Sequence, residues 1–141
     1  EGAGAAPLAL LLSGKVEVKP GEQVAVVISG GNVDPVLFER VLRKGLFESG
    51  RMLDCVLELE EGPRSLPALL TLIAGEGGTI SRVEQERGSP DLALHLIRVN
   101  LGIETRGPAH QDRILARLES AGYRVTTPNR ATGRRRRNQY T

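Results

Sequence analysis

The spacing of apolar residues after residue 50 is the feature that most limits how this chain folds. Residues 52–60 alternate between apolar and charged side chains, broken only at Val56, and so predict an antiparallel strand with one exposed face. The apolar members of this alternation are Leu53, Cys55, Leu57 and Leu59. The spacing then changes to three and four residues, which predicts a helix capped by Ser65 and ended by Gly77 and Gly78. The apolar stripe of that helix comprises Leu66, Leu69, Leu70 and Ile73.

Three more elements follow in the same half of the chain. Residues 79–87 are mostly polar, so they predict a strand at the edge of a sheet, where a second copy of the chain could pair with it. Residues 94–105 predict a third strand, whose apolar face comprises Val99, Leu101 and Ile103. Pro108 opens a second helix, and residues 123–126 predict a short last strand. The inward residues of this helix are Ile114, Leu115, Leu118 and Ala121. The order βαββαβ is the ferredoxin-like plan.

The first 49 residues have a different texture. Residues 5–12 are rich in Ala and Leu and predict a buried helix, while the continuous run at residues 24–28 predicts a strand buried on both faces of a parallel sheet. Asp34 and Pro35 then predict the N-cap and first turn of a second helix, which Gly45 is expected to stop. The apolar stripe of that helix comprises Leu37, Val41 and Leu42. Strand, glycine-rich turn and helix together predict an α/β unit.

Composition excludes several classes of protein. Hydrophobic residues make up 40% of the chain but aromatic residues only 3%, so the core must be built from aliphatic side chains. One Cys, at position 55, excludes a disulfide framework and a Cys-rich zinc module, and we expect it in the core. We expect His95 and His110 at the surface or as helix caps, and no metal site. No apolar run reaches the roughly 20 residues that span a bilayer, so we expect a cytoplasmic protein without a membrane partner.

The formal net charge of +2 is unevenly spread. Residues 127–141 contain five Arg and no acidic residue, so the rest of the chain carries about −3. The tail lacks periodicity, and we expect it to be disordered. The run Arg134 to Arg137 could bind nucleic acid, but no aromatic platform accompanies it. A solvated tail is therefore favoured over an RNA-associated domain, and nucleic acid is not an expected partner.

Two parts of the chain resemble one enzyme family. Residues 24–32, which end in Ser-Gly-Gly-Asn, resemble the strand and turn near the end of the catalytic domain in threonine and serine dehydratases. These enzymes use pyridoxal phosphate on its second fold type. Residues 1–6 resemble the glutamate-plus-small-residue segment of that domain. Residues 101–108 and 119–123 resemble the ACT regulatory domain that follows it in threonine ammonia-lyases.

The resemblance implies a domain organisation. Residues 1–49 would be an α/β fragment, the last strand, turn and helix of a fold-type II pyridoxal-phosphate domain. Residues 50–126 would be an α+β ferredoxin-like βαββαβ ACT domain, followed by the disordered Arg-rich tail at residues 127–141. Residue 1 would then be a truncation point in a longer, allosterically regulated lyase of isoleucine biosynthesis. The alternative is a stand-alone ACT-type regulatory or oligomerisation module without catalysis, and a homo-oligomer is expected in either case.

The resemblance also implies a reaction and a cofactor site. The parent reaction would convert L-threonine, or L-serine, and give 2-oxobutanoate and ammonia from threonine. Ser29 would hydrogen-bond the pyridine nitrogen of pyridoxal phosphate, while Gly30 and Gly31 would let the backbone approach the ring. Glu1 is a further candidate at the active-site wall. The alternative is that Ser29 is only a turn residue at a strand end.

No catalytic residue is expected in this chain. The lysine that binds the cofactor lies upstream of the resembling segments in this family. Lysines occur here only at positions 15, 19 and 44, in loop or helix-surface contexts without the desolvation that such a lysine needs.

A small-molecule effector site is expected near the start of the predicted regulatory domain, at Arg64, Ser65, Gly78 and Thr79. Arg64 replaces the glycine of the family's first turn, and Thr79 replaces an asparagine. Both changes weaken the case for a free amino acid, whereas Arg64 at a helix N-terminus favours an anion or a carboxylate. The alternative is that Arg64 is only an exposed residue at a helix start.

Overall fold

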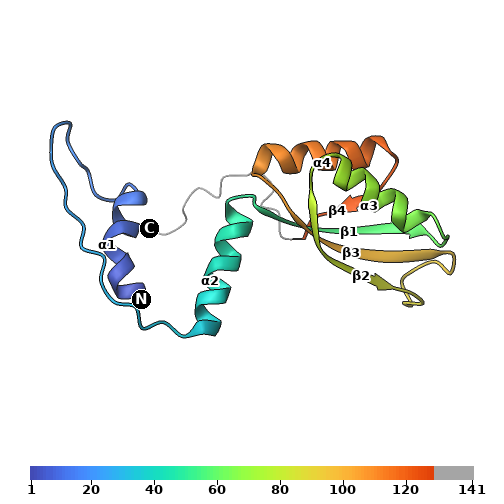
Figure 1. Ribbon diagram of the computed structural model, residues 1–141, viewed down its shortest axis with the longest axis horizontal. Helices are drawn as coiled ribbons and strands as arrows, with labels where there is room; N and C mark the ends of the chain where they lie inside the picture. Colours follow the sequence, from blue (N-terminus) through green and yellow to red (C-terminus); the bar gives the residue numbers. More distant parts are fainter. Residues whose placement is uncertain (129–141) are drawn as a thin grey trace. The chain divides into compact units, whose positions relative to one another are not determined.

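The computed structural model describes residues 1–128 and divides the chain into two compact units, residues 1–42 and the residues from 43 onward. The boundary falls inside helix α2 (Pro35–Glu48), so the first part of this helix belongs to one unit and the rest to the other (Figure 1). Most of the tail expected to be disordered, from residue 129 onward, lies outside the described residues.

The first unit contains helix α1 (Gly2–Leu12), an irregular segment and the start of α2. The helix prediction for residues 5–12 is confirmed, but its expected burial is wrong, because no residue from 1 to 42 is buried. The strand predicted at residues 24–28 does not form. A strand needs neighbours that take up its backbone hydrogen bonds, and within residues 1–128 none lies beside this segment.

Helix α2 begins as expected and ends later. The backbone N–H of Leu37 donates to Oδ1 of Asp34 at 2.9 Å, which confirms Asp34 as the N-cap. The prediction that Gly45 stops the helix is wrong, since α2 continues to Glu48. Gly50 ends the helix instead, with a φ of +67° and a hydrogen bond from Arg51 N–H back to the Leu46 carbonyl. This pairing is a Schellman motif, in which glycine takes the left-handed position.

The second unit is a four-stranded antiparallel sheet with two helices on one face (Figure 1). The strands lie in the order β2-β3-β1-β4, so the polar strand β2 is at an edge, as predicted. The elements follow the predicted order of strand, helix, strand, strand, helix and strand. They are β1 (Met52–Glu60), α3 (Ser65–Gly75), β2 (Thr79–Glu86), β3 (Leu96–Glu104), α4 (Pro108–Ser120) and β4 (Val125–Thr126).

The core lies between the sheet and the two helices. The odd-numbered apolar residues of β1 and β3 face the helices and are buried, including Cys55, as the alternation predicts. The helices contribute Leu69, Ile73, Ile114, Leu115 and Leu118. Two expectations are wrong: Ala121 is exposed at the C-cap of α4, and Arg64 rather than Ser65 occupies the N-cap of α3, without a side-chain capping bond.

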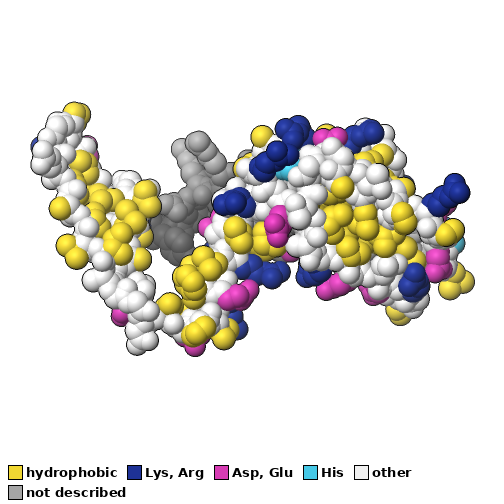
Figure 2. Space-filling view, in the orientation of Figure 1, with side chains coloured by type: hydrophobic (Ala, Val, Ile, Leu, Met, Phe, Trp, Pro, Cys, Tyr) yellow, Lys and Arg dark blue, Asp and Glu magenta, His cyan; other side chains and the backbone are white. Residues whose placement is uncertain are grey.

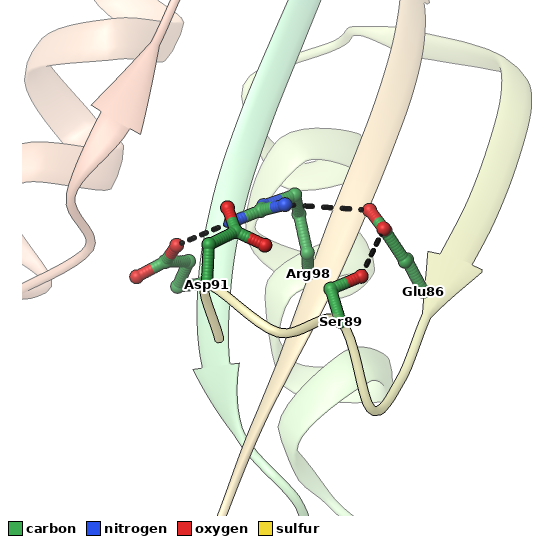
Figure 3. Close-up of polar contacts among 5 residues, drawn as sticks. Glu86, Ser89, Asp91 and Arg98 are labelled. Atoms are coloured by element: carbon green, nitrogen blue, oxygen red, sulfur yellow. Dashed lines mark hydrogen bonds and ion pairs between the residues drawn. The ribbon is translucent and has the colours of Figure 1, made fainter. Parts of the chain in front are cut away.

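The other face of the sheet is polar and is organised by Arg98. The guanidinium of this β3 residue donates to Oδ2 of Asp91 at 2.8 Å and to Oε1 of Glu58 at 3.2 Å, and it lies 3.5 Å from Oε2 of Glu86 (Figure 3). Ser89 in turn donates to Glu86. Arg98 therefore joins β1 and β2 and fixes the connection between β2 and β3. Its hydrogen bond holds the pKa of Asp91 below the ordinary range.

Replacement of Gly50 by alanine tests whether close packing fixes the end of α2. A Cβ on Gly50 would lie 2.7 Å from the backbone nitrogen of Pro108, and φ is positive there. Gly88 has nearly the same φ, +69°, but open space around a Cβ, so Gly88→Ala is a matched control. We expect Gly88→Ala to cost roughly 1–2 kcal/mol of unfolding free energy, and Gly50→Ala to cost about 1–3 kcal/mol more through overpacking. Equal losses in chemical denaturation would contradict this account of Gly50.

The pKa of Asp91 predicts a stability change in acid. Because the folded state lowers this pKa below the ordinary value of about 3.9, the contact with Arg98 stabilises the fold at higher pH. That contribution is lost as pH falls through the lower, folded value. We therefore expect Asp91→Asn to reduce the unfolding free energy at neutral pH, and the difference from the unmodified chain to shrink below about pH 4. A difference that does not change with pH would rule out this contact as its source.

Candidate functional site

The turn at residues 29–31 lies against the start of α1 within the first unit. Gly30 has a φ of +82°, and a Cβ there would lie 2.6 Å from Oε2 of Glu1. A Cβ on Gly4 would lie 1.5 Å from the backbone oxygen of Ser29, so only glycine fits at position 4. The structure thus brings the Ser29–Gly30 turn beside Glu1, although Glu1 precedes Ser29 by 28 positions in the sequence. A Cβ on Gly31 would meet open space.

The side chain of Ser29 lies at the surface of the first unit. The residue is exposed, and within residues 1–128 its hydroxyl makes no hydrogen bond. A hydroxyl can donate to or accept from a ring nitrogen, and the open backbone at Gly31 leaves room for a flat ring. The hydroxyl of Ser29 is thus open to a hydrogen-bond partner from outside the first unit.

The lysines of the chain are at its surface, as expected. Lys15 and Lys19 are exposed, and Lys44 on α2 is exposed with its ammonium 3.7 Å from Oε1 of Glu48. None has the desolvated surroundings that activate a lysine as a nucleophile.

The four residues expected to bind an effector lie at opposite ends of α3. Arg64 and Ser65 are at its first turn, whereas Gly78 and Thr79 follow its last turn and begin β2. A helix of 11 residues is about 16 Å long at 1.5 Å per residue. One copy of the chain therefore does not bring these residues into a single site.

The two ends of α3 also differ in character. Arg64 is exposed and forms no hydrogen bond or ion pair through its side chain within residues 1–128. Gly78 is buried, and a Cβ there would lie 3.0–3.1 Å from Ile73, Ile103 and Ile114. Gly78 thus has a packing role in the core, while the neighbouring Thr79 is exposed on the edge strand.

Sequence reasoning missed a buried polar cluster where β3 passes into α4. Thr105, His110 and Gln111 are each less than 9% exposed. His95 is exposed at the surface, as expected. His110 is buried, and its ring accepts a hydrogen bond from the Arg106 backbone N–H at the start of α4, so of the two expected positions, surface or helix cap, it takes the second. The sequence gives little indication of this burial, because these polar residues flank the Gly-Pro pair that begins α4, and such a local pattern is typical of an exposed loop. Their burial depends on partners 30 or more residues away in the chain, such as Glu76 and Met52.

The described residues offer neither a metal centre nor a membrane span. Within residues 1–128, no group of three or more His, Cys, Asp or Glu side chains is placed to hold a metal ion. No helix of this part is long and apolar enough to cross a bilayer.

Comparison with known proteins gives close sequence relatives. The chain is 38% identical over 125 residues to an L-threonine ammonia-lyase of Geobacter sulfurreducens, and 35% identical over 125 residues to one of Thermotoga maritima. Each alignment covers 89% of this chain and 31% of the relative. A biosynthetic L-threonine dehydratase of Mycobacterium leprae is 28% identical over 128 residues, which are 90% of this chain and 29% of that protein.

No protein-family profile matches the chain. An unknown protein from Galdieria sulphuraria superposes with a TM-score of 0.42 at 19% identity, over 77% of this chain and 58% of that one. The sequence relatives are consistent with the resemblance seen in the Ser-Gly-Gly-Asn turn and the βαββαβ segment. The chain is therefore related to the L-threonine ammonia-lyases, over 89% of its own length and about a third of theirs.

Proposed function

We propose that residues 1–126 form the C-terminal portion of a pyridoxal-phosphate-dependent threonine ammonia-lyase, which converts L-threonine to 2-oxobutanoate and ammonia. The observation that carries this proposal is the alignment of 125 residues, at 38% and 35% identity, with two proteins named L-threonine ammonia-lyase. It runs through both units, so it supports one continuous piece of the parent enzyme. The substrate is taken from the names of these relatives.

We assign residues 1–49 to the end of the catalytic domain. In support, Figure 2 shows apolar side chains at the surface of α1 and α2, and no residue from 1 to 42 is buried. Val27 and Ile28 are 77% and 64% exposed in the segment predicted as a strand. Such a segment is expected to pair and become buried when the remaining strands of a parallel sheet are present. The exposed stripe on α2 would then face the same sheet.

In this proposal the chain holds one side of the cofactor. Pyridoxal phosphate, when bound, draws electrons from the substrate carbon that loses its proton. The hydroxyl of Ser29 would hydrogen-bond the pyridine nitrogen. A carboxylate in its place would keep that nitrogen protonated, whereas a hydroxyl would not. Gly30 and Gly31 would keep side chains out of the space beside the ring, and Glu1 would stand at the wall formed by the start of α1.

We assign residues 50–126 to an ACT regulatory domain of the ferredoxin-like type. The strand order β2-β3-β1-β4 and the placement of α3 and α4 on one face support this assignment. Because Arg64 and Ser65 are one helix length from Gly78 and Thr79, an effector site that uses all four would draw them from two copies of the chain. The exposed Arg64 favours an anionic group or a carboxylate in the effector.

A second candidate is a stand-alone regulatory or oligomerisation module without catalysis. The observation that favours it is the distribution of burial, since every buried hydrophobic residue of the described chain lies between Leu53 and Leu118. In the first candidate, residues 1–49 belong to a catalytic domain, whereas in the second they take no part in catalysis. Lyase activity of a full-length parent protein would favour the first candidate.

The isolated chain is expected to lack lyase activity, because each of its lysines is exposed. The assay measures 2-oxobutanoate from L-threonine with added pyridoxal phosphate, and the L-threonine ammonia-lyase of Geobacter sulfurreducens serves as the positive control. Turnover by the 141-residue chain above that of free cofactor would show that it carries its own catalytic residue.

Substitution of Ser29 in the full-length parent tests the cofactor assignment. Loss of one hydrogen bond of roughly 0.5–1.5 kcal/mol predicts that Ser29→Ala lowers the rate about 2- to 13-fold. Ser29→Asp is expected to change the absorbance of the bound cofactor, because a carboxylate favours the protonated ring. Ser13→Ala is the control, since that hydroxyl only donates to the Leu10 carbonyl at the end of α1. Unchanged rate and spectrum in both Ser29 variants would place this side chain away from the ring.

Self-association is expected of residues 50–128. The unit is small, and its strand β2 leaves backbone groups unpaired along one side of the sheet edge. Pairing with a second copy would satisfy these groups and cover additional surface. Sedimentation at tens of micromolar should therefore show a dimer or a larger oligomer. A folded species that stays monomeric at that concentration would refute the pairing.

A further inference from the structure

We propose that His110 couples the turn after α3 to the backbone that leaves α2. The turn comprises residues 76–78 and is called the α3–β2 turn. The backbone that leaves α2 comprises residues 50–52 and is called the α2 exit. Between them lies the β3–α4 corner, residues 105–111. Hydrogen bonds from this corner reach both segments.

The first link runs from the corner to the α3–β2 turn through the His110 ring. Its Nδ1 accepts a hydrogen bond from the Arg106 backbone N–H at 3.0 Å, and its Nε2 lies 2.9 Å from the Glu76 carbonyl oxygen. A carbonyl only accepts, so these partners assign the hydrogen to Nε2 of a neutral ring. The residue is 5% exposed, and both bonds are partly buried.

The second link runs from the corner to the α2 exit. The backbone N–H of Thr105 donates to the Arg51 carbonyl at 2.9 Å, and its hydroxyl donates to the Gly50 carbonyl. Gln111 donates to the Met52 carbonyl at 3.0 Å. Thus three consecutive residues that follow α2 are each held by a buried residue of the corner. Arg51 also donates to Leu46, which connects the α2 exit to the last turns of the helix.

Packing makes the two links act together. Gly78 fits so closely among Ile73, Ile103 and Ile114 that the α3–β2 turn cannot shift without moving core side chains of α3, β3 and α4. If Gly78 and Thr79 contact an effector, as the proposed function holds, then ordering this turn would also order the corner and the α2 exit. In this respect the inference rests on the proposed function. The physical coupling itself does not, because it concerns contacts within one copy of the chain.

Two variants of His110 separate the link from local packing. The amide nitrogen of Gln reaches the position of Nε2, so His110→Gln keeps the bond to Glu76 and loses the bond from Arg106. The amide oxygen of Asn reaches the position of Nδ1, so His110→Asn keeps the bond from Arg106 and loses the bond to Glu76. Both variants are polar and smaller than histidine. A purely structural role would make them equivalent, or would favour Asn, which keeps the start of α4 capped.

The measurement is residue-resolved amide hydrogen exchange on the full 141-residue chain. The amides of Gly77 and Gly78 report on the α3–β2 turn, and those of Arg51 and Thr105 report on the α2 exit. We expect His110→Asn to speed exchange about tenfold at both places, the effect of one buried hydrogen bond. His110→Gln should stay near the original rates at both. Thr71→Ala, which removes an exposed hydroxyl bond on α3, should leave the α2 exit unchanged.

Two results would overturn the proposal: equal effects of His110→Asn and His110→Gln, or faster exchange at the α3–β2 turn with no change at the α2 exit. Should His110→Asn unfold the chain, as faster exchange at the centre of β1 would reveal, Thr105→Val tests the same link from the other side. Coupling is reciprocal, so this variant should speed exchange at Gly77 and Gly78. Unchanged rates there would also overturn the proposal. The measurement needs no substrate, effector or parent enzyme, so its failure is distinct from failure of the proposed function.

Discussion

Four directly paired rows of apolar side chains on β1 and β3 hold the second unit together, and the positions of its helices follow from them. The rows are Leu53 with Ile103, Cys55 with Leu101, Leu57 with Val99, and Leu59 with Ile97. A shift of the register by one residue would turn charged side chains such as Asp54, Glu58 and Arg98 toward the helices. The register is therefore fixed by burial on one face, and α3 and α4 cover the only face of β1 and β3 that is apolar.

The two faces of this sheet are stabilised by different interactions. The helix-facing side supplies the apolar burial that stabilises the unit, and the exposed side is ordered by charge pairs across strands. Arg82 on β2 reaches Asp54 on β1 at 3.2 Å, across Gly102 of β3, where a Cβ would lie 3.2 Å from the Cβ of Arg82. Of the four buried polar residues, Asp54 belongs to this charged face, whereas Thr105, His110 and Gln111 lie at the end of the sheet where α2 enters and α4 begins. That end joins the start of α4 to the backbone that follows α2, through the hydrogen bonds of Thr105 and Gln111.

Local pattern predicted those elements whose cause is local. The alternation in β1 and the stripe of Leu69 and Ile73 in α3 depend on near neighbours, and both formed where expected. The strand predicted at residues 24–28 depends on partners elsewhere, and within the described residues these are lacking. Helix α2 ends at Gly50 and not at Gly45 for a similar reason. Only Gly50 lies against Pro108, which is 58 residues away in the sequence.

In the candidate site, too, features with a local cause could be predicted from the sequence, whereas contacts between distant residues could not. The turn at Ser29 could be predicted from the Ser-Gly-Gly-Asn motif alone, because adjacent glycines after an apolar run indicate a turn in the local sequence. Its approach to Glu1 and Gly4 could not, because it joins two segments 25 or more residues apart. The burial of His110 was missed for the same reason. A polar residue in a loop-like sequence reads as exposed unless its distant partner, here the Glu76 carbonyl, is known.

The central claim is that the residues from 43 onward contain a complete hydrophobic core. Equilibrium denaturation of a chain that begins at Arg43 and ends at residue 128 tests it most directly, with circular dichroism and core hydrogen exchange as two independent probes. The account predicts one cooperative transition that coincides by both probes, with an unfolding free energy of about 0.05–0.15 kcal/mol per residue. A gradual loss of signal without a transition, or a shortened chain without protected amides in β1 and β3, would contradict it.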